Sequence, residues 1–109
     1  NTNFMNIEII KNLCQQNKLQ WTNHILVRLL QRNIKISDVK EAILSGKIIE
    51  EYPDDYPHPS CLILGIALNK QKLHFVCGVD KDLLWLITAY KPSATEWDST
   101  FTIRRRTQK

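Results

Sequence analysis

Three basic side chains recur every four residues in the segment that follows residue 22. They are His24, Arg28 and Arg32, at positions i, i+4 and i+8, so a helix would place all three on one stripe of its surface. Arginine offers a planar fork of donors to phosphate oxygens, and histidine titrates near neutral pH and can move a proton. The stripe suits phosphate chemistry, and its structural alternative is a solvated helix face that carries a boundary histidine.

A second group of polar side chains lies in two segments of strand-like sequence. His74 shares one strand face with Val76, while Thr88 and Tyr90 occupy alternate positions of a later strand and so share a face of it. If these two faces meet, the Tyr90 hydroxyl can donate to a phosphate or act as a general acid. The alternative is that Thr88 and Tyr90 are simply good strand formers and that His74 is a satisfied boundary residue.

Aromatic and basic residues are interleaved toward the C-terminal end. Tyr90 and Trp97 lie on either side of Lys91, and aromatic rings in such a setting can stack on the unpaired bases of single-stranded RNA. Trp97 could equally fill the core. The run from Arg104 to Arg106 could contact a phosphate backbone, or it could be a solvated terminus.

The charge of the chain is concentrated at its end. The 109 residues include 15 Lys and Arg and 11 Asp and Glu, for a net charge of +4. Four of the basic residues lie at or after position 104, so the first 103 residues carry 11 positive and 11 negative charges. A neutral body excludes a histone-like or polybasic chain, and any affinity for nucleic acid must come from the local placement of arginines.

The composition, 43% hydrophobic and 24% charged residues, is typical of a folded globular domain. We expect one domain over residues 1–109, with a body at 20–105, a basic tail at 106–109 and little weight on residues 1–4. The apolar stretches are too short for a membrane helix, and the first residues lack the basic and apolar regions of a secretory signal. We therefore expect a cytoplasmic protein without a membrane partner.

Several common kinds of site lack the residues or the spacing that they need. The glycines form no glycine-rich phosphate loop, and the cysteines are odd in number without C-x-x-C spacing. We therefore expect free thiols, no cofactor and no metal site. The glycines are Gly46, Gly65 and Gly78, and the cysteines are Cys14, Cys61 and Cys77.

Hydrophobic periodicity predicts three helices in the first half of the chain, at about residues 6–16, 22–33 and 37–46. Thr22 or Asn23 is the expected N-cap of the second helix, and Asn33 tolerates the left-handed conformation that ends a helix. Ser37 is expected to open the third helix, with Glu41 in an imperfect capping box.

The second half predicts strands at residues 47–52, 60–68, 72–79 and 83–90, with a proline-rich loop at 53–59. Alternation of Phe101, Ile103 and Arg105 predicts one further short strand. Short connections demand antiparallel neighbours. The expected fold is therefore α+β, with about three N-terminal helices packed on an antiparallel sheet of about four strands.

The stripe and the sequence after it resemble a bacterial family, domain of unknown function 4258. The residues from His24 to Ile34 match its opening pattern H-x-x-x-R-x-x-x-R-x-I, and further pieces match in order over residues 20–105. The later pieces include Ile36-Ser37-Asp38-Val39, Pro57-His58-Pro59-Ser60, Leu73-His74-Phe75-Val76 and Ile87-Thr88-Ala89-Tyr90-Lys91-Pro92, then Trp97 and Arg104-Arg105.

This resemblance implies a fold like that of RelE-like and barnase-like ribonucleases, and a role as the toxin of a toxin–antitoxin pair. The implied partners are RNA and an antitoxin with a zinc finger and a helix-turn-helix. Two positions depart from the family pattern: Asn33 replaces a common glycine, and Ser93 replaces a common aspartate, so any role of that acid is lost. The polar residues carried over by position are His24, Arg28, His74, Thr88, Tyr90 and Arg105.

Together these residues predict a metal-independent endoribonuclease. A base would activate the ribose 2′-OH for attack on the adjacent phosphate, an acid would protonate the departing 5′ oxygen, and arginine would stabilise the phosphoryl charge. His24 or His74 would be the base or acid, Arg28 and Arg105 the phosphate clamps and Tyr90 an auxiliary donor. Arg32, Thr88, Arg104 and Arg105 are the expected substrate-binding residues.

This assignment makes two demands on the fold. His24 and His74 must lie within about 10 Å of each other, with Tyr90 on the same side of the sheet. The first arginines of the tail must also fold back toward the sheet and the His24 stripe. Otherwise the chain could be a non-enzymatic module of the same fold that binds protein or nucleic acid. It could also be an immunity or regulatory protein.

Overall fold

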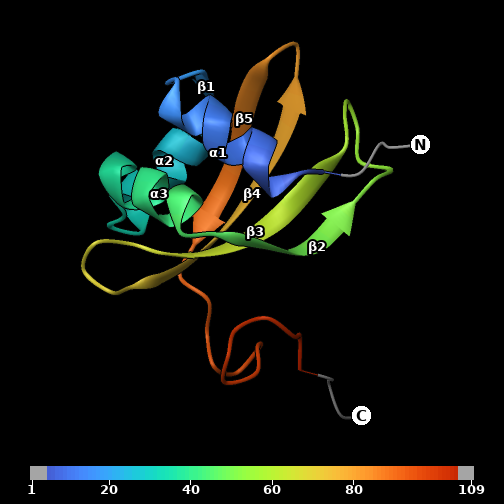
Figure 1. Ribbon diagram of the computed structural model, residues 1–109. Helices are drawn as coiled ribbons and strands as arrows, with labels where there is room; N and C mark the ends of the chain where they lie inside the picture. Colours follow the sequence, from blue (N-terminus) through green and yellow to red (C-terminus); the bar gives the residue numbers. More distant parts are fainter. Residues whose placement is uncertain (1–4, 106–109) are drawn as a thin grey trace.

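In the computed structural model, which describes residues 5–105, the helices cover one face of a five-stranded sheet (Figure 1). The helices are α1 (Ile7–Gln15), α2 (Asn23–Gln31) and α3 (Ile36–Leu44). The strands are β1 (Leu19–Trp21), β2 (Lys47–Tyr52), β3 (Ser60–Ile66), β4 (Lys72–Asp80) and β5 (Leu83–Tyr90), arranged in the order β1-β5-β4-β3-β2. The predicted α+β class and its helices in the first half of the chain are confirmed.

The prediction of about four antiparallel strands is wrong in number and in direction. The additional strand, β1, pairs in parallel with β5, so the sheet is mixed. Three residues between two helices are too few to show the alternation that identifies a strand, and their partner lies near the other end of the chain. Packing of α1 and α2 on the sheet, rather than any local signal, brings β1 beside β5.

The other strands form an antiparallel meander whose register fixes the polar residues. His74 pairs with Tyr90 and Val76 with Thr88, as the sequence analysis required for a shared face. The turn between β4 and β5 has positive φ at both Lys81 (53°) and Asp82 (63°). Two such residues in succession give the type I′ geometry that matches the twist of a tight hairpin.

The main core lies between the helices and the sheet. Its strand residues alternate with residues that point to the opposite face, which we call the outer face. Leu73 and Phe75 belong to the main core, whereas the intervening His74 lies on the outer face. The fully buried residues on the helix side are Ile10, Ile25, Val39, Ala42, Ile43, Cys61, Ile63, Phe75, Cys77, Leu84, Leu86 and Ala89.

The helix ends agree only partly with the sequence analysis. Thr22 is the N-cap of α2, accepting a hydrogen bond from the backbone N–H of Ile25, and Asn33 has the expected positive φ of 56°. The prediction that Ser37 opens α3 is wrong, because Lys35 occupies the N-cap position. The Asp38 carboxylate accepts from the Lys35 backbone N–H at 3.0 Å. That bond satisfies the start of the helix two residues earlier than a Ser37 cap would.

The segment from Lys91 to Arg105 loops away from the end of β5, in orange to red in Figure 1. The strand predicted from Phe101, Ile103 and Arg105 does not form, and a single bridge joins Trp97 to Arg104. Phe101 has a positive φ of 60°, which breaks the extended conformation that a strand needs. Within residues 5–105, no helix is long and apolar enough to cross a membrane. The predicted tail at 106–109 and residues 1–4 lie outside the described residues.

Candidate functional site

His74 is buried on the outer face, and each of its two ring nitrogens forms a hydrogen bond with another group. Its Nε2 lies 2.7 Å from the carbonyl oxygen of Phe101, and its Nδ1 lies 3.1 Å from the Tyr90 hydroxyl. A carbonyl only accepts, so Nε2 carries the proton and donates. In the neutral ring Nδ1 is then left to accept the Tyr90 O–H. The Phe101 carbonyl therefore fixes the tautomer, because the hydrogen bond of one ring nitrogen decides the role of the other.

Burial determines the charge state of this pair. Desolvation lowers the pKa of His74, and the nearby charge of Arg104 lowers it further, against the opposing effects of the Phe101 carbonyl and of Glu50. Desolvation also raises the pKa of Tyr90. Near neutral pH the pair therefore consists of an uncharged imidazole that accepts from an uncharged phenol.

Trp97 closes the site from the side of the C-terminal segment. Its ring meets His74 edge-on, with centroids 4.4 Å apart and planes at 88°. Only 1% of Trp97 is exposed, so it fills the space over the outer face and cannot stack on a base. The backbone N–H of Trp97 donates to the carbonyl of Ser93, which fixes the turn that brings the indole back onto the sheet.

A charged cluster adjoins His74 and was not predicted. Glu50 on β2 accepts two hydrogen bonds from Arg104, from Nε at 2.8 Å and from Nη2 at 3.1 Å, and a third from the Tyr52 hydroxyl at 2.5 Å. The guanidinium of Arg104 also lies over the ring of Trp97, 4.7 Å from its centroid. The cluster links strand β2 to the C-terminal segment directly beside the buried histidine.

The pKa values follow from these contacts. Burial acts to raise the pKa of Glu50, but the hydrogen bonds from Arg104 and Tyr52 outweigh it and lower the pKa. Burial and the bond to Glu50 raise the pKa of Tyr52 to about 12. Glu50 is thus a stable carboxylate, and Arg104 a stable cation whose pKa is raised by the same bond.

Two of the predicted substrate-binding residues lie near Tyr90. Arg32 reaches from the end of α2 to the sheet, where its Nη1 donates to the carbonyl of Ala89 at 2.6 Å. Its charge acts on Tyr90, whose pKa it lowers. Thr88 is half-buried on the outer face, one pair along β5 from Tyr90. The end of β5 therefore has a phenol, a hydroxyl and a guanidinium in one neighbourhood.

The other predicted residues lie apart from this group. His24 is exposed on α2, and Arg28 donates to Gln31 of the same helix at 3.0 Å. Because α2 packs through Ile25 and Leu29 on the core side of the sheet, the sheet separates His24 from His74. Neither histidine contacts the other among the described residues.

The sequence predicts that the first arginines after Trp97 fold back toward the sheet and the His24 stripe. Arg104 does return to the sheet, but to the outer face rather than to α2. Arg105 donates from Nε to the Ala94 carbonyl of its own segment at 2.7 Å, while its backbone N–H donates to Glu96. The return to the sheet is therefore confirmed for Arg104, whereas its approach to the His24 stripe is wrong, because the segment turns back over the sheet face that the helices leave open.

Sequence reasoning missed Glu50 and Tyr52. A signal was present, because these residues alternate on the predicted strand and so share one face of it. Nothing in the sequence pairs that face with Arg104, which lies about 50 residues further along the chain and in no regular element. The cluster depends on the path of the C-terminal segment.

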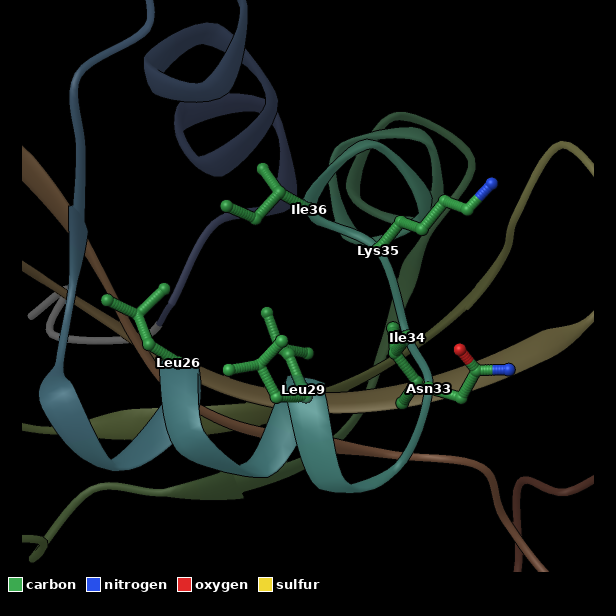
Figure 2. A pocket seen from close by; sticks show the side chains of 7 residues that line it. Leu26, Leu29, Asn33, Ile34, Lys35 and Ile36 are labelled. Atoms are coloured by element: carbon green, nitrogen blue, oxygen red, sulfur yellow. The ribbon is translucent and has the colours of Figure 1, made fainter.

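A separate hollow of about 500 Å³ lies between α2 and α3, away from the charged cluster (Figure 2). Leu26 and Leu29 approach it from α2, and Ile36 approaches it from the start of α3. Leu30 at its border is 85% exposed, an unusual position for a leucine. The lining residues are Leu26, Leu29, Leu30, Asn33, Ile34, Lys35 and Ile36.

The described residues offer no grouped ligands for a metal ion, and the three thiols are buried. Over residues 5–105, no three His, Cys, Asp or Glu side chains are grouped as a metal would require. The three cysteines are buried and unbridged, and the sulfurs of Cys61 and Cys77 lie 4.0 Å apart across β3 and β4. The groups placed to do chemistry are instead the phenol–imidazole pair and the guanidiniums around it.

Comparison with known proteins gives one match. No curated protein and no solved structure matches the chain. A protein family, described as a domain of unknown function (DUF4258), matches residues 21–91, which is more than half of the 109 residues. The matched region contains His24, Glu50, His74 and Tyr90, and it ends before Trp97. The chain therefore belongs to the DUF4258 family.

Proposed function

We propose that this protein is a metal-independent endoribonuclease in which Tyr90 exchanges protons with the substrate and His74 holds Tyr90 in place and accepts its proton. The observation that carries the proposal is the Tyr90 hydroxyl held 3.1 Å from Nδ1 of a buried, uncharged histidine. His74 has no exposed surface, so any proton that it exchanges with a substrate passes through Tyr90. The resemblance to RelE-like and barnase-like ribonucleases also favours RNA as the substrate.

The proposed step is attack of a ribose 2′ oxygen on the adjacent phosphorus. Tyr90 takes the 2′-OH proton while its own proton passes to Nδ1 of His74, which becomes an imidazolium. The negative charge of Glu50 favours that imidazolium. The P–O5′ bond breaks as the O2′–P bond forms, water protonates the departing 5′ oxygen on the far side of the phosphorus, and a 2′,3′-cyclic phosphate remains.

Arginine supplies the charge that this step needs. The phosphoryl oxygens become more negative as the 2′ oxygen attacks, and a guanidinium placed beside them stabilises that charge. Burial raises the pKa of Tyr90, but the charges of Arg104 and Arg32 act to lower it, and the same charges would act on a phosphate bound at its hydroxyl. Thr88 offers a further hydroxyl on the same face. His24 and Arg28 lie on the helix side and take no part in the proton transfer proposed here.

Replacement of Tyr90 by phenylalanine should abolish this chemistry with little effect on the fold. The variant removes one hydroxyl, and we expect at least a 100-fold loss of RNA cleavage, because a positioned proton-transfer group contributes about 10²–10⁴-fold. The measurement is the appearance of fragments ending in 2′,3′-cyclic phosphate from a mixed RNA substrate. Growth of cells that express each variant gives a second readout, with arrest expected only for active protein.

Matched controls make this test specific. Tyr56→Phe removes a hydroxyl from a tyrosine that is 93% exposed in the loop before β3, and it should cleave as the wild type does. His24→Ala should also retain cleavage, because the sheet separates it from Tyr90. Full cleavage by Tyr90→Phe, or loss of cleavage in His24→Ala alone, would contradict the assignment of Tyr90.

A second candidate function is protein binding, and the hollow between α2 and α3 favours it. Its aliphatic lining and the exposed Leu30 suit the apolar face of an amphipathic partner helix, with Lys35 at the border to meet an acidic side chain. An antitoxin with such a helix would fit a toxin–antitoxin pair. Intact RNA and unaffected growth with the wild type would favour this function over the ribonuclease.

A further inference from the structure

We propose that Glu50 is an internal anion that occupies the phosphate-binding side of Arg104, and that a nucleic-acid phosphate binds here by displacing the Glu50 carboxylate. The site deepens the proposed function, since the same phosphate would then lie near Tyr90. The ligand class is a phosphodiester of a single-stranded nucleic acid.

The hydrogen bonds of Arg104 are those that a phosphate would take. Its Nε and Nη2 donate to the two oxygens of Glu50 at 2.8 and 3.1 Å, in the fork-shaped arrangement that guanidinium forms with both carboxylate and phosphate. Trp97 lies against the guanidinium and fixes its plane. The site is therefore shaped for a two-oxygen anion, and the protein fills it with its own.

Exposure shows that this ion pair is suited to exchange. The side chain of Arg104 is 60% exposed and that of Glu50 is 24% exposed, so a phosphate in solution can reach the guanidinium. An exposed ion pair opens more easily than a buried one, because water and dissolved ions can solvate both charges as they separate.

Glu50 keeps one hydrogen bond when Arg104 leaves it. The Tyr52 hydroxyl, on the same strand, donates to Oε1 at 2.5 Å, whereas Oε2 accepts from Arg104. The side chain of Glu50 is 24% exposed, so water can solvate the carboxylate that Arg104 releases. The cost of displacement is then close to the cost of exchanging one anion for another at Arg104. This is the condition under which a phosphodiester of modest affinity can open the pair.

The test uses a DNA oligonucleotide, which lacks the 2′-OH and so binds without being cleaved. We expect Glu50→Gln to bind it about tenfold more tightly than the wild type, by fluorescence anisotropy at one fixed salt concentration. Glu51→Gln is the matched control, because it makes the same charge change on the next residue, which is exposed and pairs with no arginine among the described residues. Its affinity should change less than twofold.

Arg104→Gln completes a double-mutant cycle. We expect it to weaken binding about tenfold in the Glu50→Gln background but less than threefold in the wild type, where Glu50 already occupies the guanidinium. Equal gains from Glu50→Gln and Glu51→Gln, or a gain that persists without Arg104, would overturn the proposal. Titration with inorganic phosphate separates a site for free phosphate from one for a nucleic-acid strand, and tighter binding of phosphate than of the strand would also overturn it.

A measurement on the wild-type protein tests the proposal even if one of the variants does not fold. The Nε–H resonance of Arg104 should shift on addition of the oligonucleotide, and a spectrum without that shift at saturating oligonucleotide would contradict displacement. Binding to DNA is independent of cleavage. A protein that shows the Glu50→Gln gain but cleaves no RNA would leave this site intact and remove only the ribonuclease proposal.

Discussion

Gly65→Ala should lower the free energy of unfolding by at least about 3 kcal/mol, a large part of the roughly 5–15 kcal/mol that stabilises a typical domain. A Cβ at this position would lie 1.9 Å from the carbonyl oxygen of Ala42 and 2.5 Å from its carbonyl carbon. Both atoms belong to the backbone of α3, so no rotamer change can relieve the overlap. Urea denaturation followed by circular dichroism measures the effect.

Gly78→Ala provides the comparison within the same sheet. Its Cβ would meet the Pro59 carbonyl oxygen at 2.7 Å and the His58 ring at 2.8 Å, both in the loop between β2 and β3. A loop can shift by a few tenths of an ångström more easily than a helix packed on the sheet, so we expect a smaller loss of about 1–2 kcal/mol. Equal losses in the two variants would show that α3 is not held as closely on β3 as the structure indicates.

His74→Ala should cost about 3 kcal/mol of unfolding free energy. The change removes a fully buried ring, leaves a cavity against Trp97, and leaves the Phe101 carbonyl and the Tyr90 hydroxyl without their partner. His24→Ala, on an exposed helix surface, should change stability by less than about 0.5 kcal/mol. Urea midpoints of the two variants measured together would contradict this account if they differed little.

The pH dependence of stability gives an independent test of His74. Its pKa in the folded protein lies below the usual 6.5, so the unfolded chain binds a proton there more readily than the folded protein does. Stability should therefore be complete above about pH 7 and should fall as pH drops below 6.5. His74→Gln, which does not titrate, should flatten the curve between pH 7.5 and about pH 5, whereas a variant curve parallel to the wild type would exclude His74 as the cause.

Much of the fold could be predicted because its signals are local. The helix stripes, the Thr22 cap, the left-handed Asn33 and the starts of all four predicted strands depend on residues a few positions apart, and two of those strands also end where predicted. Alternation on β4 and β5 left open whether His74 faces Thr88 and Tyr90. The bulge between Val76 and Cys77 decides it, because the hairpin pairing of Asp80 with Leu83 would otherwise put His74 opposite Ala89. The parallel strand β1 was missed because its pairing with β5 has no local signature.

Only part of the candidate site could be predicted from the sequence, because the rest depends on contacts between residues that are far apart in the chain. The amino-acid sequence by itself determined the α+β class, the shared face of Thr88 and Tyr90, and the membership of the DUF4258 family. Only the tertiary structure decided that the sheet separates His24 from His74, that Glu50 and Arg104 form a pair, and that Trp97 is buried. Those outcomes depend on which sheet face the helices leave uncovered and on how the irregular segment after Tyr90 folds across it. No periodicity encodes that path, which is set by the burial of Trp97 and the hydrogen bonds that its neighbours make.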